Sequence, residues 1–103
     1  MKAMLRPPER ATVVVIRVDF RVRGSRSLKE KRSVIQSFLR RVRDQLSIAA
    51  CESGFHDDKV LASLTLATVG VRRDSCRAAL HQAVEMLEDR HGAEVFAVDE
   101  EVL

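Results

Sequence analysis

Residues 11–22 read ATVVVIRVDFRV, and residues 24–46 read GSRSLKEKRSVIQSFLRRVRDQL. The first stretch is β-branched and has apolar residues at every second position, which predicts a strand with one covered face. In the second stretch, apolar residues recur at the three- and four-residue spacing of a helix. Ser27 and Glu30 have the spacing of a capping box, in which the glutamate reaches back to the cap. We therefore expect a strand, a turn over residues 24–27 and an amphipathic helix that runs to about Leu46.

The rest of the chain continues the alternation of strand and helix patterns. Four further elements are expected, namely strands near residues 47–52, 60–71 and 93–98, and a helix over residues 75–91. Asp74 or Ser75 is the expected cap of this second helix, and Gly92 is its expected stop. The order strand, helix, strand, strand, helix, strand predicts the α+β class. It indicates a ferredoxin-like split βαβ fold, with an antiparallel four-stranded sheet and two helices on one face.

Length and composition fit one folded domain. The chain has 103 residues, of which 46% are hydrophobic and 32% are charged, so disorder of the whole chain is not expected. Residues 1–10 are expected to be a flexible tail, followed by a single domain over residues 11–103. No apolar run approaches the roughly 20 residues that a membrane span needs, and the first residues do not resemble a secretory signal. We therefore expect a cytoplasmic protein that does not bind a membrane.

The sequence shows no pattern of catalytic or metal-binding residues. Cys51 and Cys76 lie in apolar stretches, and we interpret both as buried structural thiols. No histidine stands at ligand spacing to them, so neither a metal nor another cofactor is expected. Asp57 and Asp58 fit a turn in a polar loop. Acylphosphatases share the expected fold and have Arg and Gly after their first strand, as Arg23-Gly24 here, but they use an Asn, and this chain contains none. We expect a non-enzymatic protein without a small-molecule substrate.

Basic residues are concentrated in the first half of the chain. From residue 17 to residue 43 there are ten basic and two acidic residues, a net charge of +8 within a chain of net charge +3. On a helical projection, four of them share one flank with Gln36 and with no acidic residue: Lys29, Arg32, Arg40 and Arg43. We expect this flank to bind phosphates of structured RNA, such as ribosomal RNA, with Arg23 and Arg26 extending it at the turn. Lys31 stands beside the apolar stripe, where it either extends to solvent and joins this surface or pairs with a carboxylate.

Two other interpretations of these patterns remain open. Exposed basic residues on a helix often only keep a small domain soluble. The sheet face opposite the helices is low in charge on its third strand, and a homodimer would cover it. The residues expected in that interface are Val13, Val15, Leu61, Ser63, Thr65, Ala67 and Val69, joined by Val95 and Ala97. The alternative function is therefore a homodimeric protein–protein interaction module that does not bind nucleic acid. Without Trp or Tyr, and with Phe20 expected to face inward, RNA contacts would involve phosphates and shape rather than bases.

Residues 24–32, GSRSLKEKR, resemble the signature of the YlxP-like family of small bacterial proteins. The resemblance implies a ferredoxin-like fold and a bacterial protein without an established activity or catalytic residues. It also implies a role near the ribosome, because members are commonly encoded beside translation initiation factor two and ribosome-binding factor A. The residues that match the signature are Ser25, Ser27, Leu28, Lys29, Glu30, Lys31 and Arg32. Family members often have an Asp-x-Trp pattern after the second strand, and here Asp57-Asp58-Lys59 keeps the Asp and lacks the Trp.

Overall fold

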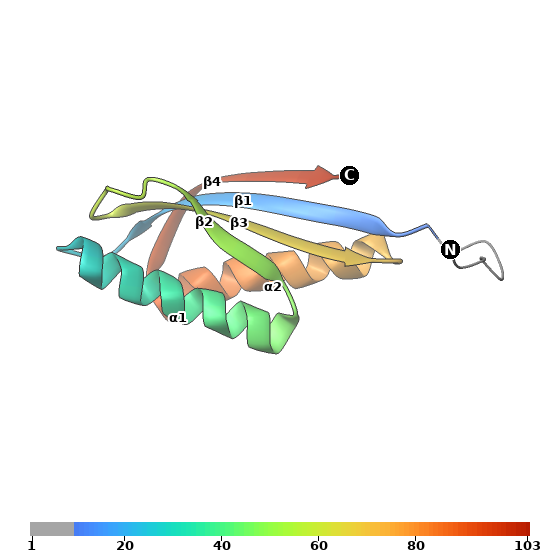
Figure 1. The fold of residues 1–103 in the computed structure, drawn as a ribbon, viewed down its shortest axis with the longest axis horizontal. Coiled ribbons are helices and arrows are strands. Elements are labelled where there is room, and N and C mark those ends of the chain that lie inside the picture. The colour runs from blue at the N-terminus through green and yellow to red at the C-terminus, as the bar shows by residue number, and fades with distance from the viewer. Residues whose placement is uncertain (1–9) are drawn as a thin grey trace, which may run out of the picture.

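The computed structural model describes residues 10–103, which form one sheet with both helices on the same face (Figure 1). The elements are β1 (Thr12–Val22), α1 (Leu28–Leu46), β2 (Ala49–Gly54), β3 (Leu61–Gly70), α2 (Arg73–His91) and β4 (Ala93–Val102). The strands lie in the order β2-β3-β1-β4, and every neighbouring pair is antiparallel. The expected ferredoxin-like α+β fold is confirmed. The expected flexible tail, apart from Arg10, lies outside the described residues.

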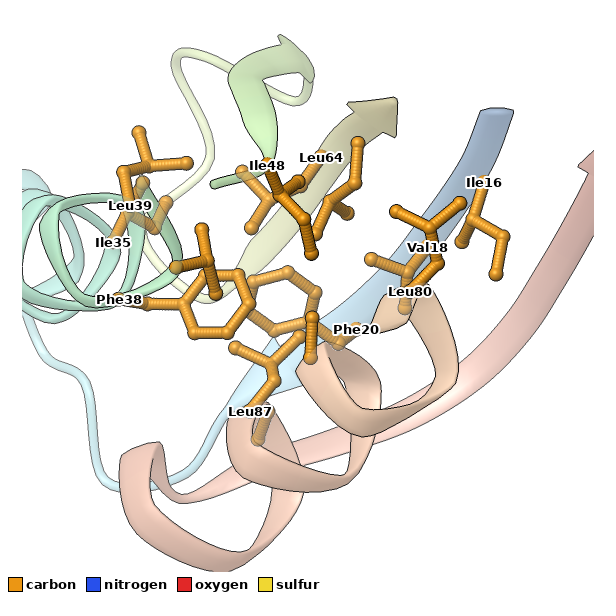
Figure 2. Packing of buried hydrophobic residues seen from close by; sticks show 14 of the residues in the cluster. Ile16, Val18, Phe20, Ile35, Phe38, Leu39, Ile48, Leu64, Leu80 and Leu87 are labelled. Atoms are coloured by element: carbon orange, nitrogen blue, oxygen red, sulfur yellow. The ribbon is translucent and has the colours of Figure 1, made fainter. Parts of the chain in front are cut away.

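The core lies between the sheet and the two helices. Every second residue of β1, from Val14 to Val22, is at most 2% exposed, which confirms the alternation read from the sequence. Figure 2 shows the ring of Phe20 from β1 close to Phe38 from α1 and Leu87 from α2. Because large buried side chains from three elements interlock here, α1 is fixed against the sheet and its opposite side faces solvent.

The start of α1 closely follows the expected capping box. The Ser27 hydroxyl accepts a hydrogen bond from the backbone N–H of Glu30 at 3.1 Å. The Glu30 carboxylate reaches one residue further back than expected and accepts from the backbone N–H of Arg26 at 2.6 Å. The first bond satisfies a backbone donor that the first turn of a helix leaves free, and the second satisfies the N–H of Arg26, which precedes the N-cap.

The boundaries of α2 differ from the expectation at one end only. The helix begins at Arg73, with Arg72 as the N-cap residue and no side-chain capping bond, so the predicted cap at Asp74 or Ser75 is wrong. The expected stop is confirmed, since Gly92 has a φ of 66°, a left-handed conformation that glycine adopts without steric cost. Within residues 10–103, neither helix is apolar enough to cross a membrane.

Two strands and one cysteine also differ from the sequence-based expectation. β2 starts two residues late because Ile48 still donates a backbone hydrogen bond to Val42 at the end of α1. β4 continues beyond residue 98, since its acidic end pairs with β1 as far as Val102. Cys76 is buried, as expected, but the prediction for Cys51 is wrong. Cys51 lies exposed in β2, at the register position of Thr65, on the sheet face that the helices do not cover.

Candidate nucleic-acid interface

The four basic residues predicted to share a flank of α1 are all exposed, and we call them the basic row: Lys29, Arg32, Arg40 and Arg43. At 1.5 Å of rise per residue, they form two pairs with about 4.5 Å within each pair and about 12 Å between the pairs. Gln36, also exposed, stands midway between the pairs. The row therefore presents two separated points of positive charge on one rigid helix.

Three members of the basic row have no partner in the part of the chain that the structure describes. Within residues 10–103, Lys29, Arg32 and Arg40 form neither an ion pair nor a side-chain hydrogen bond. Arg43 differs, because its Nη2 donates to the backbone carbonyl of Ala50 in β2 at 2.7 Å. A guanidinium has five N–H donors, so Arg43 keeps donors for a further ligand. Because β2 is an edge strand, this bond also shows that the basic row runs along the β2 edge of the sheet.

The two arginines of the turn between β1 and α1 differ in their surroundings. Arg23 is paired with Glu94 at 3.7 Å, and both side chains are exposed, so the pair contributes little and opens easily. The side chain of Arg26 is exposed and has no partner among the described residues. Both side chains are therefore accessible, but Arg23 stands beside Glu94 of β4, on the side of the sheet away from β2.

Lys31 does not belong to this surface. Its side chain is fully buried, and its Nζ donates to the carbonyls of Phe55 at 2.6 Å and Leu61 at 2.9 Å. The Glu52 carboxylate lies 3.8 Å away, so of the two expected alternatives the pairing with a carboxylate holds and the exposed phosphate contact is wrong. The ammonium group joins α1 to the loop between β2 and β3, which is a structural role.

The same loop forms the turn expected at Asp57 and Asp58. Oδ1 of Asp58 accepts hydrogen bonds from the backbone N–H groups of Leu61 at 2.7 Å and Val60 at 2.8 Å. These two bonds favour the charged carboxylate and hold the pKa of Asp58 below its ordinary value of 3.8. The turn and the buried lysine together fix the loop against the first turns of α1, which lie at the same end of the molecule (Figure 1).

The open face of the sheet brings the predicted interface residues together. The β1–β3 register pairs Val13 with Val69 and Val15 with Ala67, and it continues through Thr65 and Ser63 to Leu61. Ser63 is not accessible, however. It is fully buried, donates to the carboxylate of Asp19 and accepts from Nε of Arg17 at 3.2 Å.

Charged residues reduce the apolar part of this face. Arg17 and Asp19 stand at its centre, and Asp99 of β4 lies at the register position of Arg17. Val95 was expected on this face, but it packs against the core at the register position of Phe20, so that expectation is wrong. The uncharged area is confined to the end of the sheet where Val13, Val15, Ala67 and Val69 meet.

The opposite edge of the sheet is acidic. Glu94, Asp99 and Glu101 of β4 are exposed. The Glu100 carboxylate accepts two hydrogen bonds from Arg77 of α2, both at 3.1 Å. Nε2 of His81 lies 3.1 Å from Oε1 of the same carboxylate. The bonds from Arg77 hold the pKa of Glu100 below its ordinary value of 4.5. The basic row therefore lies at the β2 edge of the sheet, and these four acidic residues lie at the β4 edge.

Comparisons with known proteins give the fold and a family. No curated protein matches the chain. A VAO-type flavoprotein from Myceliophthora thermophila C1 is similar in structure, with a TM-score of 0.57 and 15% identity over 91% of this chain, which spans only 17% of the flavoprotein. The fold is also similar to that of SnoaB, a cofactor-independent oxygenase from Streptomyces nogalater, with a TM-score of 0.48 and 16% identity over 91% of this chain and 92% of SnoaB. For the de novo designed protein Foldit4, the TM-score is 0.47 and the identity is 14% over 91% of this chain and 97% of Foldit4.

At these identities the likeness concerns the fold alone. The sequence comparison is more specific, because one family model matches residues 13–100, a range that includes β1 from its second residue, both helices and nearly all of β4. This chain belongs to the family described as "Protein of unknown function (DUF503)".

Proposed function

We propose that the protein is a non-enzymatic cytoplasmic factor that binds the phosphates of structured RNA through the basic row. The observation that carries the proposal is that Lys29, Arg32 and Arg40 are exposed on one flank of a fixed helix without a partner among residues 10–103. Cations held in this way are free to neutralise phosphates and to release the counterions bound to them. The resemblance to YlxP-like proteins makes ribosomal RNA the first ligand to test.

The spacing of the row favours double-helical RNA over a single strand. The two cation pairs are about 12 Å apart along the helix axis, a separation that suits phosphates on the two sides of a wide, shallow groove. Gln36 lies between the pairs, where its amide group can meet the 2′-hydroxyls of such a groove. Base readout is small in this arrangement, because the chain has no Trp or Tyr and the exposed Phe55 and Phe96 lie outside α1.

Fluorescence anisotropy with a labelled hairpin of ribosomal RNA tests the proposal. The wild type should bind at about 50 mM salt and weaken by roughly tenfold or more at about 200 mM. A variant with Lys29→Glu, Arg32→Glu and Arg40→Glu should not bind. A matched control places three glutamates at Arg72, Arg73 and Arg90, which are exposed outside the row, and should retain most of the affinity. Binding by the row variant, or no binding by the wild type at low salt, would end the proposal.

A second candidate, the homodimeric interaction module, is favoured by one observation. Val69 is 65% exposed at the uncharged end of the open sheet face, beside Val13, Val15 and Ala67. Sedimentation velocity should then show a dimer that Val69→Lys converts to monomer. A monomer across the accessible concentration range would remove this candidate.

A further inference from the structure

The two edge strands of the sheet are protected to different degrees. An edge strand exposes unpaired backbone N–H and C=O groups, which proteins usually cover or interrupt. β2 has six residues and a register shift between Glu52 and Gly54, and Arg43 covers its Ala50 carbonyl. β4 has ten residues, with one irregularity at Phe96, and its pairing with β1 is regular from Ala97 to Val102. Among residues 10–103, nothing comparable covers the last six residues of β4, which form a regularly paired edge.

The backbone groups on this edge are identified by the alternation of the ladder. The N–H of Leu103 donates to the carbonyl of Val13 at 2.8 Å, so Leu103 points its backbone groups toward β1. In an antiparallel pair, alternate residues point their N–H and C=O groups toward the partner and away from it. Val98, Glu100 and Val102 consequently direct theirs away from β1. No hydrogen bond from the described residues covers them on that side.

The side chains of this edge form two rows of different character. On the helix side, Val98 is 50% and Val102 is 41% exposed, and Glu100 between them is held by Arg77 and His81 of α2. On the other side, Asp99 and Glu101 are exposed and follow Ala97. Side chains alternate along a strand, so the two kinds of residue point to opposite faces. We call Val98 and Val102 the apolar row, and Asp99 and Glu101 the acidic row.

We propose that this edge of β4 binds an extended segment of another protein by strand addition, and that the segment alternates apolar residues with lysine or arginine. Its backbone would pair with the free groups of Val98, Glu100 and Val102. Its apolar side chains would cover Val98 and Val102, while its cations would face Asp99 and Glu101. The acidic row makes a second copy of β4 an unfavourable partner, because both copies carry the same charges there.

The test uses the full-length protein and a labelled peptide, Lys-Val-Lys-Val-Lys-Val, with blocked ends. Anisotropy should show binding, and amide hydrogen exchange should slow in β4 at Val98, Glu100 and Val102. Two peptides control the chemistry. One, Lys-Lys-Lys-Val-Val-Val, has the same composition without the alternation. The other has the alternating sequence but carries N-methyl groups that remove the backbone donors. Each should bind roughly tenfold or more weakly, because the hydrogen bonds or the matched rows are lost.

A variant of the protein gives an independent check. Val98→Lys puts a cation in the apolar row of the edge and should weaken the alternating peptide by roughly tenfold, whereas Val69→Lys on the open face of β3 should not. Equal binding of the N-methylated peptide, or of the peptide without alternation, would overturn the proposal. So would a wild-type dimer that Val98→Lys dissociates, since the edge would then be occupied by a second copy. None of these outcomes decides the proposal of RNA binding, because the basic row lies at the other edge of the sheet.

Discussion

Replacing Lys29, Arg32 and Arg40 with glutamine should remove most of the salt dependence of RNA binding. Glutamine preserves polarity and helix propensity but removes the charge that releases counterions from phosphates. If each member of the basic row neutralises one phosphate of a duplex, the slope of log K against log salt is about −3.6 for the wild type. A rise from about 50 to 200 mM then weakens binding more than about 100-fold.

The triple variant retains only Arg43 in the row. Its slope should fall to about −0.9, and the same change of salt should weaken it only about threefold. Anisotropy titrations at four or five salt concentrations measure both slopes. Thermal melting should show little change, because exposed substitutions without a lost partner alter stability by about 0.5 kcal/mol or less.

The control carries the same change of charge elsewhere. Arg72, Arg73 and Arg90, each changed to glutamine, also bring the net charge from +3 to zero, but they lie outside the row. This variant should keep a slope near that of the wild type. An unchanged slope in the row variant, or an equal fall in both variants, would show that general charge rather than the basic row attracts the RNA.

Three further predictions follow from buried and paired groups. Lys31→Met removes a fully buried ammonium that donates to the carbonyls of Phe55 in the β2–β3 loop and Leu61 at the start of β3, and it should lower the free energy of unfolding by about 3 kcal/mol in urea denaturation. The hydrogen bonds from Arg77 hold the pKa of Glu100 below its ordinary value of 4.5. The ionised Glu100 therefore stabilises the fold fully above pH 4.5, and this stabilisation is lost as the pH falls through the lowered pKa of the folded state. The difference in melting temperature between wild type and Glu100→Gln should therefore narrow below pH 4.5, and a constant difference would contradict the pairing. A thiol reagent should modify Cys51 rapidly and Cys76 only on unfolding, and two equally fast thiols would contradict the burial.

Local patterns were sufficient to predict most of the fold. β1 was predicted because its alternation of buried and exposed residues is continuous, and α1 because its cap and apolar stripe agree. The end of β4 was missed for a physical reason. The sequence of residues 99–101, Asp-Glu-Glu, is not typical of a strand. In the structure, however, β1 pairs with these residues, and Arg77 donates hydrogen bonds to the carboxylate of Glu100. Tertiary pairing thus outweighs the low strand propensity of acidic residues.

The candidate site was predictable in part. The angular position of the basic row follows from helix geometry alone, so its shared flank was visible in the sequence. The burial of Lys31 was not, because it depends on two carbonyls and a carboxylate that the β2–β3 turn brings near α1. The exposure of Cys51 likewise depends on β2 lying at the edge of the sheet, which follows from strand order and not from local sequence.

The basic row and the acidic residues of β4 lie on opposite sides of the sheet, and this pair of charged groups has a dipole across it. Four strands at a spacing of about 4.8 Å place the basic and acidic edges about 14 Å apart. In the field of a polyanion such a dipole turns before contact, so the α1 side arrives first and productive encounters become more frequent. Once bound in this way, the protein would hold β4 on the side farthest from the polyanion. Its unpaired edge would then face solvent.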